Sequence, residues 1–200
     1  MKGSIVILSF FTTGLLLGLF RWLPSELLNY NFSFYVLGAL MFSVGLSIGN
    51  DPSSFRQFRH LNPRLLFLPI LTMAGTWIGV LAVSFFLSGR SAAECLAVGS
   101  GFGYYSLSGI LITQYKGIEL GTIALLSNII REGITLLLAP WMVQYFGKLA
   151  PISAGGATTM DTTFPVIVRY SGKDYAIVSI YHGFVMDFSV PFLVTFFCSL

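Results

Sequence analysis

Several uncharged stretches of the chain are long enough to cross a lipid bilayer. Crossing about 30 Å of hydrocarbon takes about 20 helical residues. A helix is the expected form, because backbone groups in lipid must satisfy their hydrogen bonds within the segment. The stretches that lack Asp, Glu, Lys and Arg, and that are predicted to be transmembrane helices, are residues 3–20, 27–50, 65–89 and 95–115.

In the second half of the chain, charged residues interrupt the apolar windows before any of them reaches spanning length. With the charges included, the windows are long enough for two full helices and one shorter element. Polar side chains are therefore expected at membrane depth. The interruptions are Arg131 and Glu132 within residues 120–147, Asp161 within 149–168, and Asp187 within 175–200.

These patterns predict an all-α integral membrane protein. We expect a bundle of six or seven transmembrane segments with broken or re-entrant elements, forming a single transmembrane domain over residues 1–200. No polar stretch is long enough to fold as a separate extramembrane domain. The longest, residues 51–64, has only 14 residues.

The composition excludes several classes of protein. Hydrophobic residues make up 55% of the chain, charged residues 10%, and the mean hydropathy is +0.81. A soluble domain carries about 25% charged residues, so a water-soluble fold is excluded. The net charge of +3 is scattered, which argues against nucleic-acid binding. Cys95 and Cys198 lie in apolar stretches and indicate neither a disulfide framework nor a metal cluster, and no cofactor is expected.

The distribution of basic residues predicts the orientation, since cytoplasmic loops are richer in Lys and Arg. If the segments alternate, and if residues 152–168 cross the membrane, seven basic residues share the side of the N-terminus and three face the other side. The N-terminus is therefore expected in the cytoplasm, and re-entry of 152–168 would invert the last helix. The two groups are Lys2, Arg56, Arg59, Arg64, Lys116, Arg169 and Lys173 against Arg21, Arg90 and Lys148.

Two stretches are poor candidates for regular helices. Residues 99–109 (GSGFGYYSLSG) contain four glycines, and residues 153–165 (SAGGATTMDTTFP) contain two glycines, four threonines and a proline. Each glycine lowers helix stability by about 1 kcal/mol relative to alanine, so both stretches are expected to be broken. Two interrupted segments are typical of the binding site of a secondary transporter. The alternatives are close helix packing for 99–109 and an extramembrane loop for 148–174.

Glu132 is the first candidate functional residue. An ionised carboxylate at the middle of a transmembrane helix costs at least about 2.5 kcal/mol, so Glu132 should face a cavity or a partner. Asn128 lies four residues earlier, on the same helix face. Arg131 points about 100° away around the helix and is expected to form a structural ion pair elsewhere. A structural ion pair is also the alternative for Glu132.

The second group of candidates belongs to the broken stretches and the last helix. If its stretch is intramembrane, Asp161 is expected to bind the substrate or to couple transport to protons. If the stretch is a surface loop, Asp161 is an ordinary turn residue. His182 is interpreted as a neutral histidine that donates to a backbone carbonyl, or as a site residue. Asp187 either lies near an interface or lines the same cavity. The hydroxyls expected to contact a polar ligand are those of Ser106, Ser108, Thr158 and Thr159.

An enzymatic function is not indicated. The chain has no catalytic Ser/His/Asp spacing, zinc motif or phosphate-binding loop. An intramembrane aspartyl protease would carry a Gly-x-Gly-Asp pattern, but GFGYY at residues 101–105 has tyrosines in place of the acid. The competing class is a non-transporting scaffold or regulatory subunit of a membrane complex, in which the acids join helices. A channel is disfavoured, because a leak of cationic amino acid would run inward with the membrane potential.

Four motifs together resemble the lysine exporter (LysO) family: SGFGYYSLSGIL at 100–111, NIIRE at 128–132, GATTMDTTFPV at 156–166 and HGF at 182–184. The similarity runs in matching order over residues 1–200. It implies export of L-lysine and toxic lysine analogues from the bacterial cytoplasm through the inner membrane. The two intramembrane acids regarded as essential in the family correspond by motif to Glu132 and Asp161. Asp187 has no evident counterpart.

The chain departs from the family pattern at its start, where members usually have further transmembrane helices. The resemblance therefore implies the C-terminal portion of a split exporter. A small separate membrane subunit, or self-association of this chain into a homo-oligomer, is expected to compensate.

The charge of lysine suggests a mechanism. Moving one positive charge outward against a negative interior costs about 2.3 kcal/mol per 100 mV, so export needs a driving force. Exchange of one proton inward for each lysine outward moves no net charge. The hypothesis is that Glu132 and Asp161 bind lysine and protons alternately, while the broken backbone engages the α-amino acid group.

Overall fold

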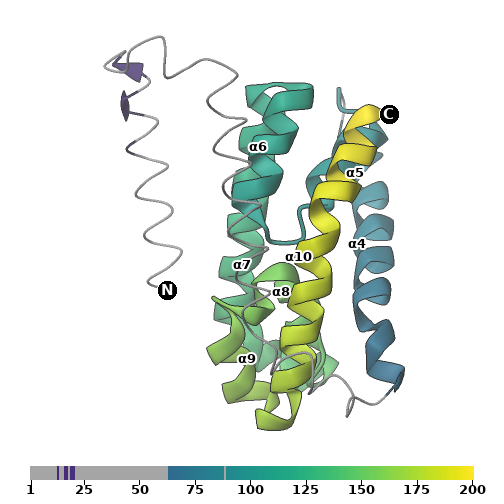
Figure 1. Cartoon of the computed structure of the whole chain (residues 1–200), viewed down its shortest axis with the longest axis vertical. Coiled ribbons are helices and arrows are strands. Elements are labelled where there is room, and N and C mark those ends of the chain that lie inside the picture. The colour runs from purple at the N-terminus through teal and green to yellow at the C-terminus, as the bar shows by residue number, and fades with distance from the viewer. Residues whose placement is uncertain (1–12, 14–15, 18, 21–62, 88) are drawn as a thin grey trace. The chain divides into compact units, whose positions relative to one another are not determined.

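The computed structural model describes residues 13, 16, 17, 19, 20, 63–87 and 89–200 (Figure 1). The predicted helix 27–50 and most of the predicted helix 3–20 lie outside these residues. The chain divides into two compact units, Met1–Pro52 and Ser53–Leu200. Every element described below belongs to the second unit, and none of its described residues forms a strand. The all-α membrane class is thereby confirmed.

The second unit consists of long helices and short interrupted ones. The long helices are α4, α7 and α10, and the remaining elements are short and broken. In chain order the elements are η3 (Pro63–Phe67), α4 (Leu68–Ser84), α5 (Ala92–Gly99), α6 (Tyr105–Lys116), α7 (Ile118–Phe146), α8 (Ala150–Gly155), η4 (Gly156–Met160), α9 (Phe164–Ser171), η5 (Lys173–Tyr175) and α10 (Ala176–Ser199).

Three helical stretches among the described residues are long and apolar enough to span a membrane: Pro63–Ser84, Ile118–Phe146 and Lys173–Ser199. They confirm the helices predicted at 65–89, 120–147 and 175–200. Large apolar side chains on their outer faces are exposed, as expected for surfaces that contact lipid tails rather than water. On α10 these exposed residues recur every fourth position, at Phe188, Phe192 and Phe196.

Residues 92–116 form a hairpin rather than the single crossing expected at 95–115. Helix α5 runs from one end of the bundle toward its middle, and α6 returns to the same end (Figure 1). Arg90, just before α5, forms an ion pair with Glu119, just after α6, so both arms begin and end together. The predicted break is confirmed at residues 100–104. We call this element the first hairpin.

Close packing, the alternative considered for the glycines of this stretch, applies to Gly99 and Gly109. A methyl group added at Gly99, the last residue of α5, would lie 2.6 Å from the Val80 side chain of α4. Gly109 on α6 lies against Gly121 on α7, and a methyl group added at Gly121 would come within 2.8 Å of the Gly109 carbonyl oxygen. The two antiparallel helices therefore approach closely at this point, as small residues permit in membrane proteins.

Helices α8, η4 and α9 form a second hairpin, which decides between the crossing and re-entrant alternatives for 152–168. The Lys148 ammonium lies 5.6 Å from the centre of the Tyr175 ring, so the two ends of the segment are adjacent. Leu149 and Tyr175 also pack against one buried apolar cluster, formed by Leu68, Ile152, Ile167 and Val178. The segment therefore returns to its own side as a hairpin. The burial of most of α8 and η4 against the long helices favours a re-entrant element over an exposed loop.

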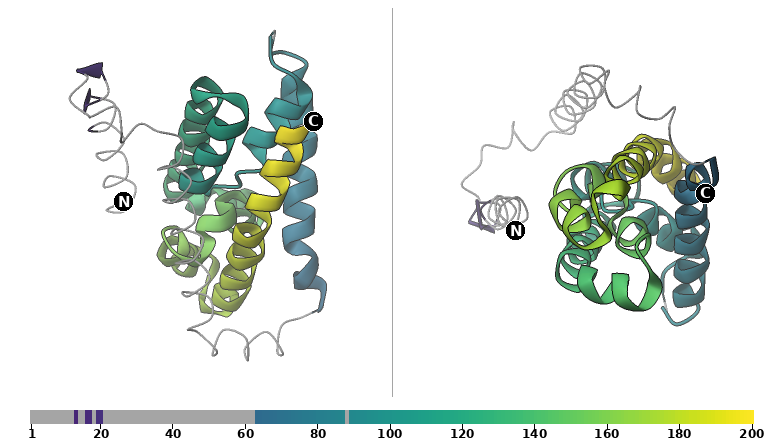
Figure 2. Two further views of the ribbon diagram at one scale, coloured as in Figure 1. Left: turned by 45° about the horizontal axis from the view of Figure 1, so that its top comes forward. Right: turned by 90° about the horizontal axis from the view of Figure 1, so that it is seen from below.

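The two hairpins enter from opposite ends of the bundle. Helices α4 and α10 run in the same direction (Figure 2). Tyr181 donates to the Leu66 carbonyl (3.1 Å) near their starts, and further along both helices Trp77 meets Phe197 (5.6 Å between ring centres). Trp77 also donates to the Ser100 hydroxyl of the first hairpin (2.9 Å). The apolar cluster at the base of the second hairpin lies at the starts of α4 and α10.

This arrangement predicts a labelling pattern for single cysteines introduced into a protein whose native cysteines are replaced by serine. Arg90→Cys and Lys116→Cys should react with an impermeant maleimide from one side of the membrane, because both flank the first hairpin. Lys148→Cys and Lys173→Cys should react from the other side. Labelling of positions 90 and 116 from opposite sides would show that the stretch crosses the membrane.

Candidate functional site

The tips of the two hairpins meet through their backbones. The Ala157 amide of the second hairpin donates to the Phe102 carbonyl of the first, at 2.8 Å. Phe102 itself has a positive φ of 44°, which is uncommon for a residue with a side chain. At Gly156 (φ 64°) an added methyl group would overlap the Phe102 carbonyl, and at Gly103 (φ 95°) it would lie 2.9 Å from the Gly155 carbonyl oxygen. Glycine is therefore required for this contact.

Asn128 on α7 holds the tip of the first hairpin. Its side-chain oxygen accepts a hydrogen bond from the Gly103 amide at 2.7 Å, and its side-chain nitrogen donates to the Ser108 hydroxyl at 3.2 Å and to the Ala124 carbonyl at 2.8 Å. The structure thus brings together the predicted residues Asn128 and Ser108, both buried. Their polar groups satisfy the unwound backbone, as buried polar groups must.

Threonines hold the tip of the second hairpin in a similar way. Thr158 donates to the Gly155 carbonyl (3.0 Å) and lies 3.2 Å from the Thr163 hydroxyl. Thr159 donates to the Ser179 carbonyl of α10 (2.9 Å), and the Ser179 hydroxyl donates back to the Thr159 carbonyl (2.7 Å). The predicted residues Thr158 and Thr159 therefore fasten the tip to itself and to α10. Sequence reasoning missed the contribution of Ser179.

Arg131 joins the two hairpins. Its Nε donates to the Ala154 carbonyl at 2.7 Å and its terminal nitrogen donates to the Ser153 carbonyl at 3.0 Å, both in the second hairpin. The guanidinium also lies over the Phe102 ring of the first hairpin, 5.9 Å from its centre. Among the described residues no carboxylate lies within ion-pairing distance of Arg131, so the predicted ion pair is not found there. The cation instead meets carbonyl groups near the C-terminus of α8, where positive charge is favoured.

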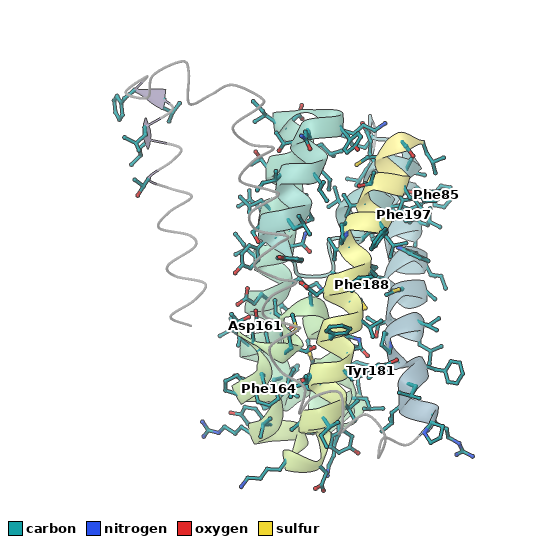
Figure 3. All side chains as sticks on the ribbon, viewed as in Figure 1. Phe85, Asp161, Phe164, Tyr181, Phe188 and Phe197 are labelled. Carbon is teal, nitrogen blue, oxygen red and sulfur yellow. The ribbon has the colours of Figure 1, made fainter. Side chains whose placement is uncertain are left out.

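Three acidic residues surround the tips at membrane depth. Glu132 on α7 is fully buried, and Asp187 on α10 is 5% exposed. Asp161, directly after η4, is exposed and accepts hydrogen bonds from the amide and the hydroxyl of Thr162. Figure 3 shows it about midway along the bundle. Asp161 interacts electrostatically with both Glu132 and Asp187, so it lies between the other two acids in the charge network.

Two tyrosines that sequence reasoning did not assign border these acids. Tyr104 interacts electrostatically with Asp161 and Asp187, and Tyr105 with Glu132 and Asp161. They lie at the start of α6, immediately after the break, so the first hairpin supplies phenol groups to the acids of the other elements. The sequence signal for them is the pair of tyrosines in the GFGYY motif, directly after the glycines that break the helix.

His182 reaches the tips from α10, whereas Ser106 lies apart from this group of contacts. The buried His182 ring shares a hydrogen bond with the Thr72 hydroxyl of α4 through Nε2, at 3.0 Å. The ring also interacts with the backbone of Gly156 and with the charge of Arg131. Whether His182 is a structural histidine or a site residue stays a prediction. Ser106 is half-buried in the first turn of α6.

A separate open cavity of about 610 Å³ lies between α4, α7 and α8, within the size range of small-molecule sites. Hydroxyl groups and the Arg131 guanidinium line it, but none of the three acids does. The described residues contain no group of three or more His, Cys, Asp or Glu placed to hold a metal ion. The polar residues lining the cavity are Thr72, Thr76, Ser127, Arg131, Thr135 and Ser153.

Opposed hairpins with unwound polar tips, set between long apolar helices, define an all-α integral membrane protein. The chain belongs to the lysine exporter LysO family, which it matches over residues 8–198.

Two relatives support this assignment. The chain is 36% identical over 163 residues to the lysine exporter LysO of Escherichia coli. The aligned residues cover 82% of this chain and 54% of that protein, so the chain spans about half the length of that relative. It is 33% identical over 195 residues to a putative lysine exporter of Haemophilus influenzae, which covers 96% of this chain and 97% of that protein. No solved structure gave a significant match.

Proposed function

We propose that this chain exports L-lysine and lysine analogues across the bacterial inner membrane, in exchange for protons. The observation that carries the proposal is the meeting of two hairpin tips, from opposite ends of the bundle, beside acidic residues at membrane depth. Non-helical backbone at this depth is tolerated where it is buried or lines a wet cavity, and transporters use it to bind their substrates. The two relatives are named as a lysine exporter and a putative one.

The acids fit a cationic substrate. An ionised carboxylate attracts the side-chain ammonium of lysine, and can take up a proton after lysine leaves. Asp161 is the exposed member of the group and is therefore the first contact for the ammonium. Glu132, fully buried, adds negative potential from α7. Electroneutral exchange removes the cost of about 2.3 kcal/mol per 100 mV that export of a lone cation carries.

The described basic residues support an orientation. The end of the bundle at which the second hairpin begins and ends has four basic residues, and the opposite end has two. We therefore place the end with four basic residues in the cytoplasm and Leu200 on the outside. Re-entry of one hairpin alone would invert the last helix, but re-entry of both restores its predicted direction. Compared with the count made from the sequence, Lys116 moves to the outside and Lys148 moves to the cytoplasmic side. The four residues are Arg64, Lys148, Arg169 and Lys173, and the two are Arg90 and Lys116.

The proposal includes a partner in the membrane, either a small separate subunit or a second copy of this chain. Native mass spectrometry of the complex purified from its own membranes distinguishes the two. A second copy gives a multiple of the 21.9 kDa chain mass, and a subunit adds a different mass.

Lysine flux in inside-out vesicles, prepared from cells that express the native complex, tests the function. With an acidic lumen, labelled lysine is expected to accumulate inside, and collapse of the pH gradient should reduce accumulation at least about tenfold, equivalent to about 1.4 kcal/mol of lost driving force. Vesicles from cells without the protein give the background. Flux at background in vesicles that contain the inserted complex would favour the alternative of a non-transporting subunit.

A further inference from the structure

Asp187 is the one acid of the network that the proposed function leaves unused. It lies in the spanning helix α10, one turn after Gly183, where α10 packs closely on η4. Its side chain is 5% exposed. Among the described residues it has no hydrogen bond and no ion pair, and its interactions there are electrostatic ones with Asp161 and Tyr104. Such a buried carboxyl group must either be neutral or have a cation beside it.

Asp161 has a different environment from Asp187. The amide and hydroxyl of Thr162 donate to its carboxylate, and these hydrogen bonds stabilise the ionised form. Asp187 has no such donors among the described residues and is less exposed to water. Two neighbouring carboxylates repel each other, so a proton binds to the carboxylate with fewer hydrogen-bond donors and less contact with water. Here that carboxylate is Asp187.

We propose that Asp187 carries the proton exchanged for lysine, while Asp161 binds the lysine ammonium. This assignment rests on the proposed function. On the cytoplasmic side, protonated Asp187 releases its proton to water as the ammonium arrives beside Asp161. On the outside lysine leaves, the two carboxylates repel each other, and Asp187 takes a proton from the external water.

The charges balance in both directions. With lysine bound, two carboxylates and one ammonium give a net charge of −1 for this group. On the return, ionised Asp161 and neutral Asp187 also give −1. The other titratable group that faces Asp187 in the described chain is Tyr104. The neighbouring His182 on α10 is engaged with Thr72 and takes no part.

Asp187→Asn imitates the protonated acid and separates lysine movement from proton movement. In vesicles without a pH gradient, exchange of labelled for unlabelled lysine should stay within about threefold of the unaltered protein, because Asp161 is intact. Accumulation driven by an acidic lumen should fall at least about tenfold, or about 1.4 kcal/mol. Lysine uptake by the variant should instead respond to a membrane potential set with potassium and valinomycin, since no proton compensates the charge.

Two matched variants complete the test. Asp187→Glu keeps a titratable group and should retain accumulation driven by pH. Asp174→Asn removes an exposed acid in η5 and should behave as the unaltered protein. Accumulation driven by pH in Asp187→Asn would overturn the assignment, and so would loss of lysine exchange in that variant while it remains inserted. Absence of exchange in the unaltered protein would overturn the proposed function itself, and this assignment with it.

A measurement on the unaltered protein applies if Asp187→Asn fails to insert. Addition of lysine to the purified complex in weakly buffered detergent should release about one proton per lysine bound, because binding is linked to deprotonation of Asp187. Binding without proton release would overturn the assignment. Stimulation of lysine accumulation by a sodium gradient in place of a pH gradient would overturn it as well.

Discussion

Asp161→Asn and Glu132→Gln are each expected to reduce lysine flux in inside-out vesicles to background, a loss of at least about a hundredfold, equivalent to about 2.7 kcal/mol. Both changes keep the shape of the side chain and remove its charge. Asp161 loses the ability to pair with the ammonium, and Glu132 loses the negative potential that it contributes from α7. The measurement is initial uptake of labelled lysine with an acidic lumen.

The structure also predicts that these two variants remain folded. An amide at position 161 still accepts the hydrogen bonds of Thr162 through its oxygen, and a neutral side chain at position 132 is easier to bury than a charge. Equal insertion and an unchanged thermal midpoint should accompany the loss of flux. Asp174→Asn serves as the control for removal of an acid outside the tips. Transport at the original rate in either variant would reject that acid as part of the site.

Gly156→Ala is expected to have the second largest effect, because it separates the two hairpin tips. The backbone at Gly156 has a φ of 64° and a ψ of −126°, and holding a residue with a side chain in such a conformation costs about 1–3 kcal/mol. The new methyl group would also overlap the Phe102 carbonyl, and overpacking costs a further 1–3 kcal/mol or so. Loss of the hydrogen bond from Ala157 to Phe102 follows.

Both lysine flux and the thermal midpoint of the purified protein should therefore fall in Gly156→Ala. Gly79→Ala is the matched control. Gly79 lies within helix α4, where an added methyl group would meet no atom within 4 Å, so alanine there should be neutral or slightly stabilising. A Gly156→Ala protein with normal flux and stability would show that the tip contact is dispensable.

The sequence predicted the three spanning helices found among the described residues, because length and absence of charge determine whether a segment can cross lipid. It could not distinguish one crossing from a hairpin in residues 92–116. An eight-residue arm, a short break and a twelve-residue arm have the same hydropathy as a single interrupted helix. The deciding interactions, the ion pair of Arg90 with Glu119 and the contact of Lys148 with Tyr175, join residues far apart in sequence.

The candidate site was predictable to the extent that charge marked it. Glu132 and Asp161 stood out because carboxylates are costly in a bilayer. The substrate-binding roles assigned to Asn128 and Thr159 stay predictions, and the structure shows both side chains supporting the hairpin tips. Buried unwound backbone needs polar side chains as hydrogen-bond partners. The sequence alone cannot tell such supporting side chains from side chains that bind a ligand.

Each hairpin is followed by a long helix, α7 in one half and α10 in the other, and the halves run in opposite directions. An inverted arrangement of this kind would allow one half to move against the other around the tips. Conformations open to either compartment would then be populated comparably before any gradient is applied. Under that condition the ion and substrate concentrations, rather than a built-in preference of the fold, determine the direction of net movement.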